Sequence, residues 1–195
     1  MKAIRIGRLA CSALALFVCV AYNASNTRLI AQKQASSEKP WQELVSTEGH
    51  FRVLLPDTPN EMFVPINGQI VHTEFRAVTV KSSVAVYAVL FGDFPDASKD
   101  PEIIRAAFDN GRDRAISEGK LILVSEKNIG TASVPAREYV FEDGAFLVRT
   151  RVYYVKERLY QVIFGSPLLN GMPAGMIQYY DGLAAKFLNS FKIGA

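Results

Sequence analysis

Cysteine and histidine are scarce in this chain, and their scarcity excludes most thiol and metal chemistry. The two cysteines, Cys11 and Cys19, both lie near the N-terminus, so the remaining chain has no disulfide and no thiol nucleophile. The two histidines, His50 and His72, show no recognised spacing of metal ligands. We therefore predict no metal site, no cofactor, and a domain that is stabilised by its hydrophobic core alone.

The chain also lacks an excess of charge once its N-terminus is set apart. Residues 1–24 contain Lys2, Arg5 and Arg8 but no acidic residue, which leaves 19 of the 22 basic residues against 19 acidic ones. A formally neutral chain has no net attraction for a phosphate backbone. We therefore expect no nucleic-acid partner.

The N-terminus has the pattern of an export signal. Three basic residues precede a 14-residue apolar run at 9–22. That length suits the apolar core of a signal peptide and falls short of the roughly 20 residues that a membrane-spanning helix needs. We predict a signal peptide over residues 1–24, cleaved after Ala21 or Ala24, and export to the periplasm or the extracellular space. A retained N-terminal membrane anchor, using residues 9–22, is the alternative.

A folded domain is predicted to begin at Trp41. Residues 25–40 are polar, have no apolar period and end in proline, which is typical of a linker. Apolar side chains then alternate at Phe51, Val53 and Leu55, as expected for a strand with one buried face. No repeat or second boundary follows, so residues 41–195 are predicted to form a single domain.

Hydrophobic patterns predict more strands and two helices. Residues 84–91 are apolar on both faces, which indicates a central strand covered on both sides. Asp100 and Pro101 suit the start of a helix that stops near Gly119. Apolar residues spaced i, i+3, i+4 and i+7 between Met176 and Phe191 predict a second helix. The other predicted strands are 69–80, 120–130, 136–144, 145–156 and 158–166. The fold class is therefore α+β, an antiparallel sheet with helices packed on it.

A set of turn and core residues accompanies this order of elements: Trp41, Gly49, Phe51, Pro56, Pro59, Tyr160, Ser190 and Phe191. Together they resemble the PsbP-like superfamily, which includes small exported bacterial proteins of the DcrB kind and a nuclear-import factor that binds the Ran GTPase. The resemblance covers about residues 41–193 and implies an α/β/α sandwich with binding or assembly roles rather than catalysis. No functional residue can be assigned from it.

No catalytic constellation is recognisable. Ser166 is followed directly by Pro167 and is not part of a Gly-x-Ser-x-Gly elbow. The glycine-containing segment 171–175 lacks the lysine and hydroxyl residue of a phosphate loop. We therefore predict no catalytic residue, and a secreted hydrolase is the least favoured function.

One group of side chains suggests a binding site for an anionic partner. Arg149, Arg151 and Tyr153 share one face of their predicted strand, and we expect Arg137 on the neighbouring strand to reach the same patch. Arginine binds carboxylate and phosphate groups in a bidentate manner. The alternative is that nearby carboxylates neutralise these arginines on a solvated face, the candidates being Glu74, Glu138 and Glu142.

Three functions follow from these observations. The favoured one is an exported non-catalytic domain that binds a protein or a cell-envelope component. The second is a small-ligand carrier, which requires a pocket between a helix and the sheet. The third is the hydrolase, which requires titratable groups gathered in a cleft.

Overall fold

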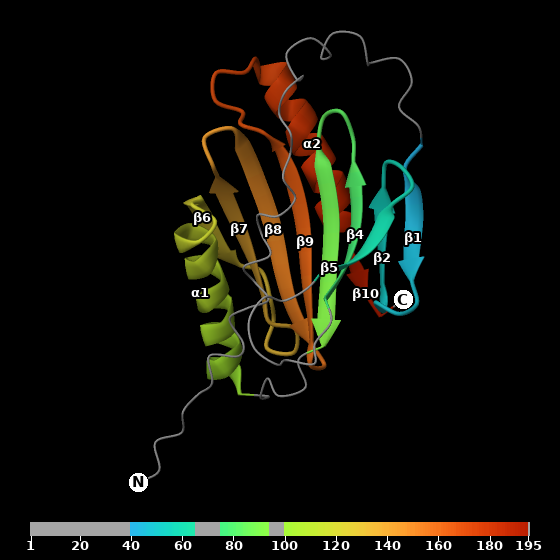
Figure 1. Cartoon of the computed structure of the whole chain (residues 1–195), viewed down its shortest axis with the longest axis vertical. Coiled ribbons are helices and arrows are strands. Elements are labelled where there is room, and N and C mark those ends of the chain that lie inside the picture. Colours follow the sequence, from blue (N-terminus) through green and yellow to red (C-terminus); the bar gives the residue numbers. More distant parts are fainter. Residues whose placement is uncertain (1–39, 65–74, 94–99, 195) are drawn as a thin grey trace.

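The computed structural model describes residues 40–64, 75–93 and 100–194, which form an α/β/α sandwich with antiparallel sheets (Figure 1). The predicted α+β class is therefore confirmed. The large sheet has seven strands, in the spatial order β3 (Asn60–Val64), β4 (Phe75–Lys81), β5 (Val86–Asp93), β9 (Arg158–Pro167), β8 (Phe146–Val155), β7 (Ala136–Glu142) and β6 (Ile122–Asn128). A second sheet has the order β1 (Gln42–Ser46), β2 (Phe51–Leu55) and β10 (Lys192–Ile193).

Strands β5 and β9 form the centre of the large sheet and are buried on both faces. Tyr87 and Val89 point to one face of β5 and Ala88 and Leu90 to the other, and all four are at most 4% exposed. This confirms the central strand predicted from the doubly apolar run 84–91, although β5 runs from Val86 to Asp93 and the first two residues of the run precede it. Its two faces must be covered by other elements.

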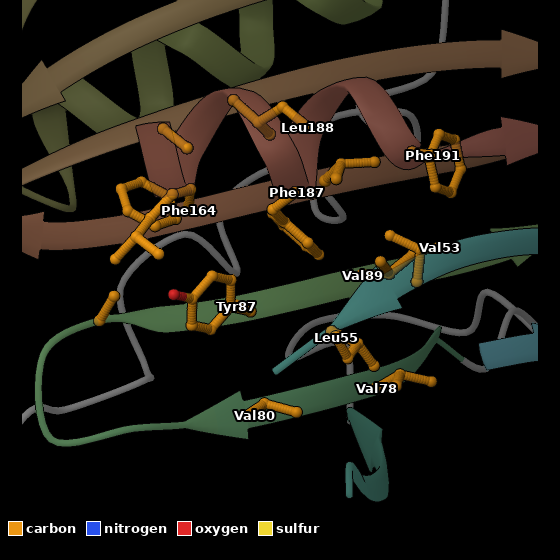
Figure 2. Close-up of a cluster of buried hydrophobic side chains, with 14 of the residues drawn as sticks. Val53, Leu55, Val78, Val80, Tyr87, Val89, Phe164, Phe187, Leu188 and Phe191 are labelled. Atoms are coloured by element: carbon orange, nitrogen blue, oxygen red, sulfur yellow. The ribbon is translucent and has the colours of Figure 1, made fainter. Parts of the chain in front are cut away.

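Helix α2 (Ala174–Ser190) and strand β2 cover one face. The Tyr87 ring packs edge-on against Phe164 and Phe187, with ring centroids 5.4 and 5.3 Å apart. Figure 2 shows these rings between α2 and the sheet, with Val53 and Leu55 of β2 entering the same core. The predicted strand with Phe51, Val53 and Leu55 buried is confirmed.

Helix α1 (Pro101–Ser117) covers the opposite face (Figure 1). It begins as predicted, because the Asp100 carboxylate accepts a hydrogen bond from the Glu102 backbone N–H and Pro101 occupies the first turn. Ile104 and Phe108 face the sheet, where the Tyr139 hydroxyl donates to the Phe108 carbonyl at 3.2 Å. The two helices thus lie on opposite faces.

The structure differs from the sequence prediction at several elements. Strands β3 and β10 were not predicted, and the N-terminal strands form a separate small sheet rather than part of one sheet. Helix α1 ends at Ser117, and the left-handed residue that follows is Lys120 rather than Gly119. The predicted signal peptide, most of the linker, and residues 69–74 with His72 and Glu74 lie outside the described residues.

The turn between β1 and β2 leaves no room for a side chain at Gly49. A Cβ atom at this position would lie 2.4 Å from the Phe51 ring and 2.7 Å from the Ser46 hydroxyl. The Gly49 N–H also donates to that hydroxyl at 2.9 Å. The small sheet can therefore pack Phe51 into the core only because this residue has no side chain.

Replacing Thr150 tests whether the core under α1 contains an energetic defect. Thr150 is completely buried, and its hydroxyl has no hydrogen-bond partner among the described residues. A buried unpaired hydroxyl costs about 1–3 kcal/mol. Thr150→Val keeps the side-chain shape and is expected to raise the free energy of unfolding, measured by urea denaturation, by about 1 kcal/mol.

Thr79 provides the matched control for this variant. Thr79 is 4% exposed, and its hydroxyl contacts the Asn60 carbonyl at 3.4 Å. Thr79→Val therefore removes a partnered hydroxyl and is expected to bring no gain in stability. Equal changes in the two variants would show that the Thr150 hydroxyl is not a defect.

Candidate functional site

The pairing of β7 with β8 separates the four residues predicted to form an anion-binding patch. The hairpin places Arg137 opposite Val152, which faces α1. Tyr153 packs instead in the core beneath α2, and the alternation of side chains puts Arg149 and Arg151 on that same face. The expectation that Arg137 joins them is wrong, because a pairing register that differs by one residue moves a side chain to the other face.

Arg149 and Arg151 connect β8 to α2. Arg149 forms an ion pair with Asp181 of the helix. Arg151 donates to the Glu138 carboxylate at 2.6 Å, and to the Leu188 carbonyl and the Asn189 side chain at 3.1 and 2.9 Å. The neutralisation of Arg151 by Glu138 agrees with the alternative derived from the sequence, whereas Asp181 was not foreseen. A bound anion would have to compete with these contacts.

Arg137 has the corresponding role under α1. Its guanidinium contacts Asp109 of the helix at 2.5 Å and Glu126 of β6 at 2.7 Å, and it lies 5.7 Å from the centre of the Phe108 ring. Arg112 adds a contact to Glu126 at 2.9 Å. These ion pairs are partly buried and tie α1 to the edge of the large sheet.

Tyr153 lies in a groove of about 900 Å³ at the end of the sandwich where β8 meets β10. We call it the aromatic groove and define it by Tyr153, Tyr160 and Phe191. The Phe191 ring lies 5.4 Å from Tyr153 and 5.7 Å from Tyr160, centre to centre. The other residues that line the groove are His50, Asp93, Val134, Val155, Lys156, Arg158, Lys192, Ile193 and Gly194.

Some charged side chains around this groove are already paired with each other, and others are available to a partner. Arg158 binds both oxygens of Asp93 and also donates to the Glu48 carbonyl at 2.6 Å. Lys156 and Lys192 are exposed and form no ion pair within the described ranges 40–64, 75–93 and 100–194. The rim of the aromatic groove therefore presents two available positive charges, while its acidic group is already paired.

In the groove, the pKa of the acidic residue is lowered and the pKa values of the two tyrosines are raised, so all three shifts lead away from pH 7. The hydrogen bond from Arg158 lowers the pKa of Asp93. Burial raises the pKa of Tyr153 and of Tyr160, although Arg151 and Arg158 partly oppose this. At neutral pH, both phenols are protonated hydrogen-bond donors and Asp93 is ionised. General acid–base catalysis needs a group that titrates near the working pH, and none of these three provides one.

A second groove, of about 850 Å³, lies between α1 and the sheet, and we call it the α1 groove. Ile104, Phe108 and Tyr154 supply its apolar surface, and Arg137 lies at its side. This is the kind of pocket that the carrier hypothesis required. Other residues at its opening come from the loop between β6 and β7: Gly130, Thr131, Ala132, Ser133 and Pro135.

The described part of the chain contains no group of three or more His, Cys, Asp or Glu side chains that could hold a metal ion. His50 lies on the rim of the aromatic groove, and the position of His72 is outside the described residues. Neither described helix is long and apolar enough to span a membrane.

Comparison with solved structures identifies the fold. No family model and no curated protein matches the sequence. The solution structure of cyanobacterial PsbP from Synechocystis has a TM-score of 0.54 at 10% identity, covering 84% of this chain and 98% of that protein. The chain therefore has a PsbP-like fold, in agreement with the resemblance inferred from its sequence.

Two other solved structures are more distant. The yeast Ran-binding protein Mog1p has a TM-score of 0.43 at 8% identity, covering 79% of this chain and 95% of its own. A Pseudomonas aeruginosa protein of unknown function has a TM-score of 0.35 at 10% identity, covering 74% of this chain and 91% of its own.

Most of the aromatic groove escaped prediction as a site. Tyr153 was predicted to bind a ligand, but Tyr160 and Phe191 were recognised only as residues that carry the family resemblance. The available signal was the position of aromatic residues close to lysines in the sequence, with Tyr153 before Lys156 and Phe191 before Lys192. The contact between Tyr153 and Phe191, 38 positions apart, depends on the way α2 returns along the sheet.

Replacing Arg151 tests its structural role. Arg151→Ala removes charge-assisted hydrogen bonds to Glu138 and to the end of α2, and it leaves a half-buried carboxylate unpaired. We expect the free energy of unfolding to fall by about 1.5–3 kcal/mol in urea denaturation. The control, Arg105→Ala, removes an exposed pair with Glu102 and should change stability by less than about 0.5 kcal/mol. Comparable losses would contradict the structural role.

The buried phenol of Tyr139 predicts a loss of stability in alkali. Burial raises its pKa to about 12, above the value of about 10 in an unfolded chain. The associated stability is fully present below pH 10 and is lost as the pH rises through the folded-state pKa. Tyr139→Phe is therefore expected to flatten the decline of the unfolding free energy between pH 10 and 12. Identical slopes for the two proteins would refute this assignment.

Proposed function

We propose that this chain is an exported, non-catalytic domain that binds a protein or a cell-envelope component through the aromatic groove. The observation that carries the proposal is one open groove in which the half-buried Tyr153, backed by the buried rings of Tyr160 and Phe191, lies beside two lysines that have no ion pair among the described residues. Aromatic side chains dominate the binding energy of many interfaces, and rim charges guide the approach of a partner.

The electrostatics of the groove support binding over catalysis. Its acid is engaged by Arg158, and its phenols are held in the protonated form. We further propose that Arg137, Arg149 and Arg151 stabilise the sandwich, and that Tyr153 is the member of the predicted patch that contacts a partner. The signal peptide, the linker and a relationship to DcrB-like exported proteins belong to this proposal and rest on the sequence.

Site-specific crosslinking tests this function. A photo-crosslinking side chain replaces Lys192 at the groove in full-length protein expressed in its native envelope. The matched control replaces Lys81, an exposed strand lysine at the opposite end of the sheet. We expect one stoichiometric partner to crosslink from position 192 and not from 81. Equal labelling from both positions would argue against binding at this groove, as would no labelling from position 192 or from a second probe at the exposed His50, which leaves both lysines in place.

A small-ligand carrier is the second candidate, and the α1 groove is the observation that favours it. Its volume lies within the range of ligand pockets, and Ile104, Phe108 and Tyr154 give it an apolar surface. Native mass spectrometry of protein purified from its own source distinguishes this function. A bound small molecule that is lost on replacing Ile104 with Lys would support the carrier.

A further inference from the structure

The aromatic groove runs along the edge of the small sheet that β10 forms. Strand β10 pairs with β2 and with no other strand among the described residues, and the continuous segment Phe191–Gly194 lines the groove. The Gly194 N–H donates to the His50 carbonyl on the side of β2. Because backbone groups alternate sides along a strand, the N–H and C=O of Ile193 point away from β2 and are available to another strand.

The floor beside this edge suits apolar side chains. The half-buried Tyr153 ring packs on the buried Phe191 ring, with the ring centres 5.4 Å apart, and the half-buried Val155 and Val134 extend the apolar surface. An extended peptide presents every second side chain to one face. A peptide paired with β10 would therefore place alternate side chains on Tyr153 and Val155.

The charged side chains at the rim of the aromatic groove indicate which charge a bound peptide would carry. Lys156 and Lys192 are available, whereas Asp93 is occupied by Arg158, so the groove is complementary to acidic side chains. The linker of this chain is a poor match, because residues 25–40 contain Arg28, Lys33 and Lys39 against the single acid Glu38. The charges favour a segment from another protein.

The turn that presents Lys156 is conformationally unusual. Lys156 and Glu157 form the two-residue turn between β8 and β9, with φ angles of 49° and 68°. Asparagine and glycine are the residues that favour such turns, and other residues adopt this conformation at a cost. A lysine here is unfavourable for the turn itself, which is expected if its charge serves recognition.

We propose that the aromatic groove binds an acidic, extended segment of a partner protein, which adds a strand to the edge of β10. Its backbone pairs with Ile193, its apolar side chains cover Tyr153 and Val155, and its carboxylates meet Lys156 and Lys192. This inference rests on the proposed function and specifies the chemistry of the partner. It belongs to the strand-addition mode of peptide recognition.

Fluorescence anisotropy with a labelled heptapeptide of alternating glutamate and aromatic residues tests the proposal on the full-length chain. We expect saturable binding that weakens as salt is raised. The same peptide with lysine in place of glutamate should bind at least about tenfold more weakly. Methylation of alternate backbone nitrogens of the acidic peptide should also lower its affinity about tenfold, because the methylated peptide cannot pair with β10.

Variants of the protein separate binding from folding. Lys192→Glu is expected to lower the affinity for the acidic peptide about tenfold, and the control Lys81→Glu should leave this affinity within about twofold. Lys156→Asn relieves the conformational strain of the turn, and it should lower the affinity while the thermal midpoint of unfolding is kept or raised. This pair of effects would not arise from a loss of structure.

Several results would overturn the inference. These are equal binding of the acidic and basic peptides, binding that is insensitive to backbone methylation, and binding of anionic lipid vesicles with none of the acidic peptide. If a partner crosslinks at position 192 but the acidic peptide does not bind, this inference fails while the proposed function stands. If no partner crosslinks and no peptide binds, both fail.

Discussion

The structure depends on one constraint, that the centre of the large sheet is buried on both faces. Strands β5 and β9 place aromatic and β-branched side chains on the α2 face, whereas their α1 face carries mainly aliphatic side chains and the fully buried Gln161. Water must therefore be excluded from both sides. Helix α2 and the small sheet cover one face, and α1 covers the other. The small sheet is therefore part of the core, since Phe51, Val53 and Leu55 contact α2 and the strands.

In this arrangement each helix must also be held in one alignment on the sheet, whose edges are polar. Partly buried arginines provide the alignment: Arg137 connects α1 to β6 and β7, while Arg149 and Arg151 connect β8 to α2. Arg158 similarly joins the end of β5 to the turn before β2. Since these guanidinium groups are engaged, lysines supply the available charge in the groove where β8, β9 and β10 converge, beside the half-buried Tyr153.

Much of the fold was predictable because the patterns that specify it are local. The two-residue period at Phe51–Leu55 and the helical period from Met176 to Phe191 each depend on neighbours within a few residues. The cap at Asp100 is equally local, and the order of elements was sufficient to suggest the PsbP-like fold. Strand β10 was missed because it has only two residues, and β3 because successive side chains such as Met62 and Phe63 are both exposed, so that no buried face marks it. Hydrogen bonds to β2 and β4 define these strands more than their composition does.

The sequence by itself determined the class of fold, the central position of β5, the start of α1, the length of α2 and the scarcity of thiol and metal ligands. Only the tertiary structure decided which face each arginine occupies and which residues form the grooves. The reason is physical. The face of a side chain depends on the pairing register between strands, which one residue in a turn can reverse. The grooves depend on contacts such as Tyr153–Phe191, which join residues far apart in the chain.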